Sequence, residues 1–333
     1  MMVRNIESGE LSAFRTELMG MSALLILICH VCGYVNLSKV ALYTLSLGNI
    51  GVDLFLFLSG MGMWNSLSNG GYKGIRYWYI HRYLKLFIPY LIIILPYDAY
   101  RYAIGQMPGF DSLDYLFGLS TLRFYVSHDT PWFIAALIPL YLLSPLFFRL
   151  LRKYRWTAAI VLICIFYLCL FIPASFQLDL LNNVIKNTQF VIVRATVFVL
   201  GFALGQPIKE NKQISLWWLI VLFLVGILVV IATRHLVYGY FFLTMPLLFV
   251  FCRFIRSVGV RIRKFVHLMG EISLESYILN GILPKIVITI FAALQLPSGG
   301  NMVPYIVACL ISIPVGYGFH LISKMILGII TFK

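Results

Sequence analysis

Charged residues are scarce in this sequence. Only 11% of its 333 residues are Asp, Glu, Lys or Arg, whereas 61% are hydrophobic and the mean hydropathy is +0.92. Soluble domains are charged at about a quarter of their positions. So little charge excludes a sizeable soluble domain and predicts an all-α, multi-pass membrane protein, which we interpret as one membrane domain covering residues 1–333.

The six cysteines give no sign of a disulfide framework or a metal centre. All lie within apolar runs or at their edges, as small buried hydrophobic residues do. Cys29, His30 and Cys32 are close in sequence, but at about 100° per residue they point to different sides of a helix and cannot share one ion. We therefore expect no bound metal.

Long apolar runs of about 20 residues divide the chain into about ten predicted transmembrane helices. No small-residue cleavage site follows the first run, so we expect no signal peptide. The predicted spans are 17–35, 48–66, 86–100, 132–150, 157–173, 189–206, 215–231, 238–252, 268–292 and 302–327. An even number of spans places both termini on the same side of the membrane.

Acidic residues are few, with 12 Asp and Glu against 26 Lys and Arg and a formal net charge of +14. If the N-terminus is cytoplasmic, most Lys and Arg residues fall in cytoplasmic connections, as the positive-inside rule requires. The distribution therefore predicts an N-in, C-in bundle. It also accounts for the positive charge without a nucleic-acid partner.

Ionisable residues inside apolar runs are costly, so each is a candidate functional residue. His30 lies in the outer half of the first span, in "LLILICHVCGYVN", and Asp53 lies at a similar depth in the second, in "GNIGVDLFLFLSG". Because adjacent antiparallel helices can bring the two together, we expect Asp53 to orient His30 as a catalytic base. A His–Asp pair that only joins two helices is the alternative.

One outer connection, from Tyr97 to Trp132, is long and rich in aromatic residues. Loops of this length are usually functional or disordered, and the aromatic content argues against disorder. Two interpretations remain open. The loop either stacks on the sugar rings of a substrate or packs as a lid on the helix ends.

Six segments between residues 15 and 280 occur in a characteristic order. They read "RTELMG…ILICH", "GNIGVDLFLFLSG", "HRYLKLFIPY", "PWFIAALIPLYLLSP", "RATVFVLGFALG" and "MGEISLESYILN". In this order they resemble the acyltransferase-3 family of integral-membrane acyltransferases. The resemblance implies transfer of an acyl group, commonly acetyl from cytoplasmic acetyl-CoA, to a hydroxyl of a cell-surface glycan or its lipid-linked precursor.

The resemblance also implies roles for individual residues. His30 matches the essential first-helix histidine of the family, and Asp53 matches the acidic residue of the second helix. Ser59 matches the serine of a conserved "SG" pair. Arg82 and Lys85 match two basic residues ahead of a proline, although the second is usually arginine. These residues are the expected catalytic pair and part of the expected acyl-CoA site.

Further positions match the family or depart from it. Trp132 and Arg194 match residues of the fourth and sixth helices. Many members carry an arginine where this chain has Met19, and Arg15, one turn earlier on the same face, is the candidate substitute. Asn280 stands where relatives often have a histidine, so a second catalytic histidine is not available there.

The expected site agrees with the shape of CoA. Its phosphates cannot enter the bilayer, so they should stop at a basic inner mouth formed by Arg82 and Lys85, with Arg15 nearby. The pantetheine arm could then reach His30, since Arg15 and His30 are about 22 Å apart along a helix. Arg82 and Lys85 could alternatively be ordinary positive-inside anchors.

Two further cations, Arg194 and Lys285, lie inside predicted spans. They stabilise charge developing on the thioester oxygen, bind an anionic acceptor, or simply pair with Asp53 or Glu275. Trp132 is expected at the same substrate or oxyanion site.

We therefore expect a membrane O-acyltransferase of the plasma (inner) membrane, with acyl-CoA as donor substrate, a glycan or lipid-linked glycan as acceptor, lipid around it and no permanently bound cofactor. A homo-oligomer is left open. A secondary transporter or flippase that uses the same intramembrane residues as a relay is the alternative function, although no inverted repeat is visible.

Overall fold

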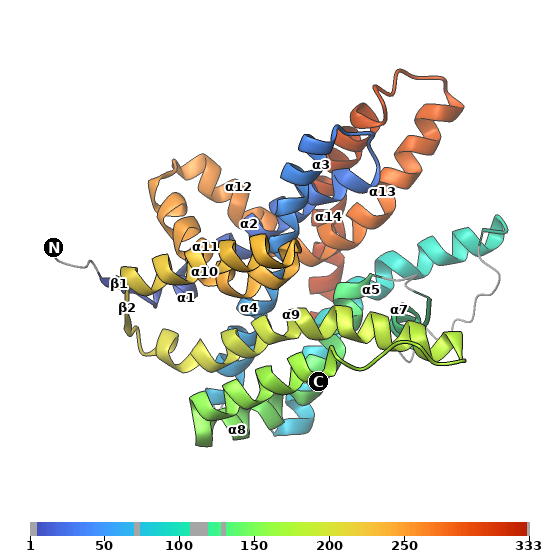
Figure 1. Cartoon of the computed structure of the whole chain (residues 1–333). Helices are drawn as coiled ribbons and strands as arrows, with labels where there is room; N and C mark the ends of the chain where they lie inside the picture. The colour runs from blue at the N-terminus through green and yellow to red at the C-terminus, as the bar shows by residue number, and fades with distance from the viewer. Residues whose placement is uncertain (1–4, 70–73, 107–118, 128–130, 332–333) are drawn as a thin grey trace.

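The computed structural model describes residues 5–69, 74–106, 119–127 and 131–331, and these form a bundle of long α-helices (Figure 1). The elements are β1 (Asn5–Glu7), α1 (Glu10–Ala13), α2 (Arg15–His30), η1 (Val31–Gly33), α3 (Lys39–Ser46), η2 (Leu47–Asn49), α4 (Ile50–Ser68), α5 (Ile75–Ala103), η3 (Leu119–Leu122), α7 (Arg123–Ser127), α8 (Trp132–Cys169), α9 (Asp179–Lys209), β2 (Gln213–Ser215), α10 (Leu216–Thr233), α11 (Leu236–Ser257), α12 (Val260–Glu271), α13 (Ser273–Ala293) and α14 (Met302–Thr331). The predicted all-α polytopic fold is confirmed.

Nine helical stretches among the described residues are long and apolar enough to cross a membrane. The sequence predicted about ten, and the difference lies in α8. The backbone of Arg155 leaves the helical conformation there, with φ 33° and ψ −100°, so α8 consists of two helices joined at a kink. These halves correspond to the predicted spans 132–150 and 157–173.

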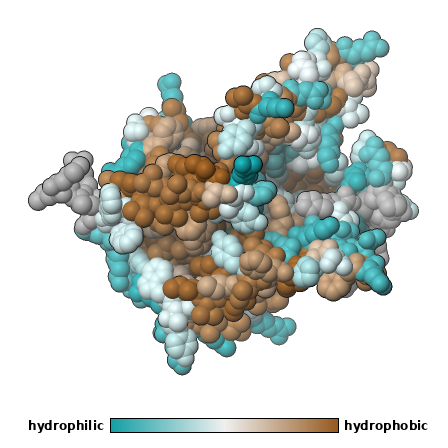
Figure 2. All heavy atoms as spheres, viewed as in Figure 1, coloured by the Kyte–Doolittle hydropathy of each residue, from teal (hydrophilic) through white to brown (hydrophobic). Residues whose placement is uncertain are grey.

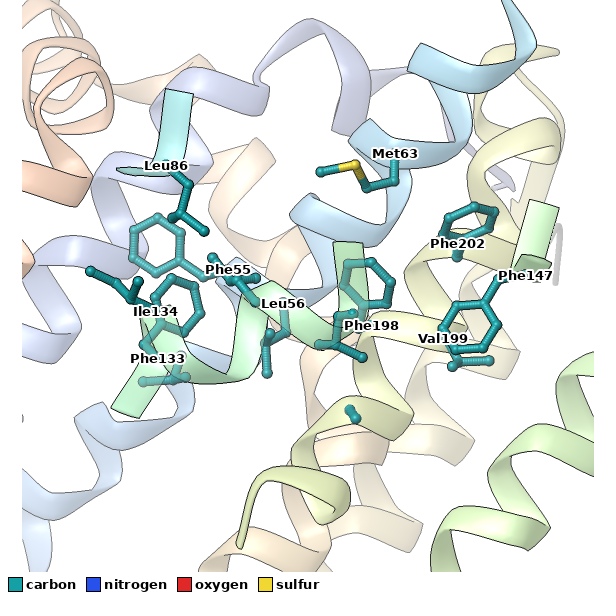
Figure 3. Packing of buried hydrophobic residues seen from close by; sticks show 14 of the residues in the cluster. Phe55, Leu56, Met63, Leu86, Phe133, Ile134, Phe147, Phe198, Val199 and Phe202 are labelled. Carbon is teal, nitrogen blue, oxygen red and sulfur yellow. The ribbon is translucent and has the colours of Figure 1, made fainter. Parts of the chain in front are cut away.

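Helix α4 forms the centre of the bundle. Every residue from Ile50 to Met61 is buried, as expected for a helix that is apolar on all sides. Its aromatic and aliphatic side chains interdigitate with those of α8 and α9, including Phe55 against Phe133 with ring centroids 5.8 Å apart (Figure 3). This packing fixes the position of the residues that α4 contributes to the site.

Glycines allow α4 and α9 to approach closely. A Cβ atom at Gly60 would lie 2.1 Å from the carbonyl oxygen of Phe198, and one at Gly201 would lie 2.1 Å from that of Phe57. The backbones therefore touch at two reciprocal points. Small residues at membrane helix contacts have this effect generally.

The outer surface of the bundle is apolar over wide areas. Helix α10 exposes Trp217, Trp218, Leu228 and Ile231, and a continuous hydrophobic face is visible in the space-filling view (Figure 2). Surfaces of this size are avoided in water and are expected against lipid. The exposure pattern agrees with the predicted multi-pass membrane protein.

The N-terminal segment lies against the connection between α9 and α10. Strand β1 pairs antiparallel with β2, and Glu10 accepts from Arg256 at 3.0 Å. This arrangement gathers β1, the loop containing Lys212 and the end of α11 at one end of the bundle. All three are segments that the charge distribution predicts to be cytoplasmic.

Candidate active site

A first cavity, of about 120 Å³, lies between α2, α4, α5, α8 and α13. We call it the basic cavity because Arg82 and Lys85 line it together with Ser59. Its other lining residues are Met19, Phe55, Leu86, Phe133, Leu137, Tyr141, Ser273, Leu274 and Tyr277. Phe55, Leu86 and Phe133 cluster at one end of the view in Figure 3. The structure therefore brings three of the predicted acyl-CoA residues into one cavity.

Arg15 lies beside the basic cavity. Its Nε donates to the carbonyl oxygen of Leu58 at 3.3 Å, and its guanidinium lies against Gly62 of α4. Arg82 and Tyr141, which both line the basic cavity, are its electrostatic neighbours. Arg15 thus adds positive charge near the cavity that the sequence analysis assigned to CoA.

A second cavity, of about 280 Å³, contains His30, and we call it the histidine cavity. Its other lining residues are Tyr34, Ile94, Tyr97, Asp98, Arg101, Pro131, Tyr277, Ile278, Gly281, Ile282 and Lys285. Burial, with a smaller contribution from Tyr97, raises the pKa of the Tyr34 phenol. Of the predicted substrate residues Arg194, Trp132 and Lys285, it is Lys285 that lines the same cavity as His30.

Asn280 of α13 holds the imidazole of His30. Its Oδ1 is hydrogen-bonded to Nδ1 of His30, and its Nδ2 lies 3.8 Å from Sγ of Cys309. Because an amide oxygen only accepts hydrogen bonds, Nδ1 carries the proton and donates it. The tautomer defined in this way leaves a lone pair on Nε2.

Asp53 has a different partner from the one predicted. Its Oδ2 accepts from Nη1 of Arg194 at 2.7 Å, and both side chains are only 1% exposed. The expected hydrogen bond from His30 to Asp53 is thus replaced by an ion pair between α4 and α9. The physical reason is charge, since an arginine compensates a buried carboxylate better than a neutral imidazole does.

Aromatic rings enclose the guanidinium of Arg194. Its Cζ lies 5.2 Å from the ring centroid of Trp132, 5.5 Å from that of Phe190 and 6.0 Å from that of Tyr240. Arg194 and Trp132 line neither the basic cavity nor the histidine cavity. Pairing with Asp53 was the alternative to a substrate role for Arg194, and the observed geometry corresponds to that alternative.

Glu275 also has its own partner. Its Oε1 lies 3.1 Å from Nδ1 of His320 on α14. Neither Arg194 nor Lys285 therefore pairs with Glu275, which was the other arrangement that the sequence left open.

Tyr277 is shared by the two cavities. It lines both of them, its hydroxyl accepts from the backbone N–H of Phe133 at 3.4 Å, and its ring centroid lies 6.2 Å from that of His30. The sequence analysis did not identify this residue. A signal was present, because Tyr277, Gly281 and Lys285 are spaced by four and therefore share one face of α13.

Asp98 and Arg101 were also missed. They lie at the start of the long connection from Tyr97 to Trp132, and Nη1 of Arg101 donates to Oδ1 of Asp98 at 3.2 Å. Residues 107–118 and 128–130 of this connection lie outside the described residues, so its predicted role as lid or sugar platform stays a prediction. Its described ends border the histidine cavity through Tyr97 and Pro131.

A polytopic helical protein with an intramembrane histidine, a basic cavity and a second polar cavity has the architecture expected of a membrane-embedded transferase. The family model described as "Acyltransferase domain" matches residues 19–321. The chain belongs to this acyltransferase-3 family, as its motifs indicated. No curated protein and no solved structure matches the chain.

Proposed function

We propose that this protein transfers an acyl group, acetyl in the first instance, from cytoplasmic acyl-CoA to a hydroxyl of a cell-surface or lipid-linked glycan. One observation carries the proposal: a cavity with two basic residues and a cavity with His30 meet at Tyr277. The family membership supports acyl transfer over the transporter alternative. The charge distribution supports an N-in, C-in orientation. The proposed location is the plasma membrane, where a cell-surface acceptor is within reach.

The donor enters through the basic cavity in this proposal. Arg82 and Lys85 hold the phosphates of CoA, with additional positive charge from Arg15. The apolar lining around Phe55 and Leu137 suits the thin pantetheine arm. Helix α2 runs from Arg15 to His30 over 16 residues and so separates them by about 22 Å, which is comparable with the extended arm.

The acyl transfer itself takes place where the two cavities meet. Nε2 of His30 removes the proton from the acceptor hydroxyl, and the oxygen attacks the thioester carbonyl carbon. The carbon–sulfur bond then breaks, and the imidazolium returns the proton to the leaving sulfur. The products are the acyl ester of the glycan and CoA with a free thiol. Asn280 keeps the base in the required tautomer throughout.

The other predicted residues take different positions in this mechanism. Ser59 lines the donor path. Of Arg194, Trp132 and Lys285, we propose Lys285 as the substrate contact, because it shares a cavity with His30. The Asp53–Arg194 pair stabilises the contact between α4 and α9, and α4 contributes Phe55 and Ser59 to the basic cavity.

Acyl transfer can be measured directly with purified protein and radiolabelled acetyl-CoA. We expect slow CoA release and, with membrane glycans added, a labelled glycan ester. His30→Ala should abolish both while still binding CoA in isothermal titration, because the ring acts as base and not as anchor. His235→Ala, in the exposed connection before α11, is the matched control and should retain activity. Turnover by His30→Ala at the wild-type rate would refute the mechanism.

A further inference from the structure

Among its described lining residues, the histidine cavity contains one cation more than its acidic residues compensate. Asp98 is buried and forms an ion pair with Arg101 on α5 at 3.2 Å. Lys285 lines the same cavity from α13 and is exposed, and within the described part of the chain no carboxylate lies at ion-pair distance from its ammonium group. The described lining of the histidine cavity therefore has a net positive charge.

There is room for a ligand beside Lys285. Gly281 precedes it by one helical turn on the same face of α13, and a Cβ atom added at Gly281 would meet nothing within 4 Å. Tyr34 and Tyr97 add aromatic rings to the same cavity, and such rings are suited to contact with sugars.

We propose that the histidine cavity selects an acceptor that carries an anionic group, a carboxylate or a phosphate, and that Lys285 binds this group. This inference rests on the proposed function, because it names the acceptor class of the same site. Lys285 lies five residues beyond Asn280, about 7.5 Å along α13. The anionic group therefore sits on the acylated sugar itself or on its immediate neighbour.

The charge selection can be tested without the natural acceptor. Gly281→Cys introduces a thiol into the open space one turn from Lys285. The thiol is treated with sulfonatoethyl or trimethylammonioethyl methanethiosulfonate, which are anionic and cationic reagents, and the parent chain provides the background from the native cysteines. The ratio of the two rates reports the local charge, because any effect on the thiol itself cancels.

In the Gly281→Cys background, we expect Lys285→Gln to lower the anionic-to-cationic rate ratio about tenfold. Lys39→Gln, on exposed helix α3 outside the cavity, is the matched control and should leave the ratio unchanged. An equal ratio with and without the Lys285 charge would overturn the inference, because the ammonium group would then point away to the membrane interface.

The second measurement compares ligands as protectants of the same thiol. Methyl glucuronide and glucose 1-phosphate should slow its modification several-fold, and methyl glucoside should slow it less; the stronger of the two anions identifies carboxylate or phosphate as the source. Equal protection by all three sugars, or none by either anion, would overturn the inference. Neither measurement uses acyl-CoA, so failure of the proposed acyl transfer would be detected separately, in the radiolabel assay.

Discussion

At the scale of single residues, the partner of His30 is the most informative feature of the site. The acceptor on Nδ1 is a neutral amide, that of Asn280, and no carboxylate occupies that place. A neutral acceptor fixes the tautomer without strongly favouring the protonated ring. Nε2 therefore keeps a lone pair that can accept the proton of the acceptor hydroxyl.

Asn280→Asp should move the acid limb of the kcat/KM profile to higher pH by about one unit or more. A carboxylate facing Nδ1–H stabilises the imidazolium and raises its pKa, so a higher pH is needed to regenerate the base. Asn280→Ala should lower kcat about 10²-fold without changing that limb. Asn182→Asp, in a loop interaction with Phe176 away from both cavities, is the control. An unshifted profile in Asn280→Asp would show that Asn280 does not act through His30.

Asp53→Asn should destabilise the protein by about 3–5 kcal/mol, because it leaves the guanidinium of Arg194 buried without its counter-charge. Thermal unfolding in detergent measures this loss. Combining Asp53→Leu with Arg194→Met should recover much of the stability, since both charges are then removed together. If Asp53→Asn instead unfolds at the wild-type temperature but loses turnover, Asp53 takes part in the chemistry directly.

At the scale of helices, the contact between α4 and α9 determines how accurately the site is built. Gly201→Ala places a methyl group 2.1 Å from the carbonyl oxygen of Phe57, so the two helices must separate. We expect a destabilisation of about 1–3 kcal/mol, seen as a lower unfolding temperature in detergent.

Gly328→Ala provides the matched control for this substitution, because a Cβ atom at Gly328 of α14 meets nothing within 4 Å. Replacing a helical glycine by alanine in open space should be neutral or slightly stabilising. Equal unfolding temperatures for the two variants would mean that α4 and α9 are not in close backbone contact.

At the scale of the whole molecule, the proposal requires the two substrates to arrive from opposite sides of the membrane. In vesicles of known orientation, acyl-CoA should support activity only from the face that carries the N-terminus. Arg82→Ala and Lys85→Ala should each raise the KM for acetyl-CoA about tenfold or more. The KM for acetyl-pantetheine, which lacks the phosphates, should rise much less.

Arg149→Ala is the control for this experiment, because Arg149 is predicted to be cytoplasmic but does not line the basic cavity. Activity with acyl-CoA added only to the opposite face would reverse the proposed orientation. If Arg82→Ala raised the KM equally for both donors, the phosphates of CoA would not bind in the basic cavity.

The sequence by itself determined that the protein is a helical, multi-pass membrane protein of the acyltransferase-3 family. It also identified the apolar spans, even the two halves of α8, and the ionisable residues within them. These properties depend on local hydropathy and on short motifs, which are read directly along the chain. Ser59 comes from one family motif and Arg82 and Lys85 from another, and the fold places all three around one cavity.

The tertiary structure decided which side chains meet. Asp53 pairs with Arg194, which is 141 residues away, and His30 with Asn280, which is 250 residues away. Such pairs depend on the rotation of each helix about its axis and on the helices packed beside it, and hydropathy contains neither. The same packing makes Tyr277 part of both cavities and leaves Lys285 without an ion-pair partner among the described residues, because it turns one face of α13 toward His30.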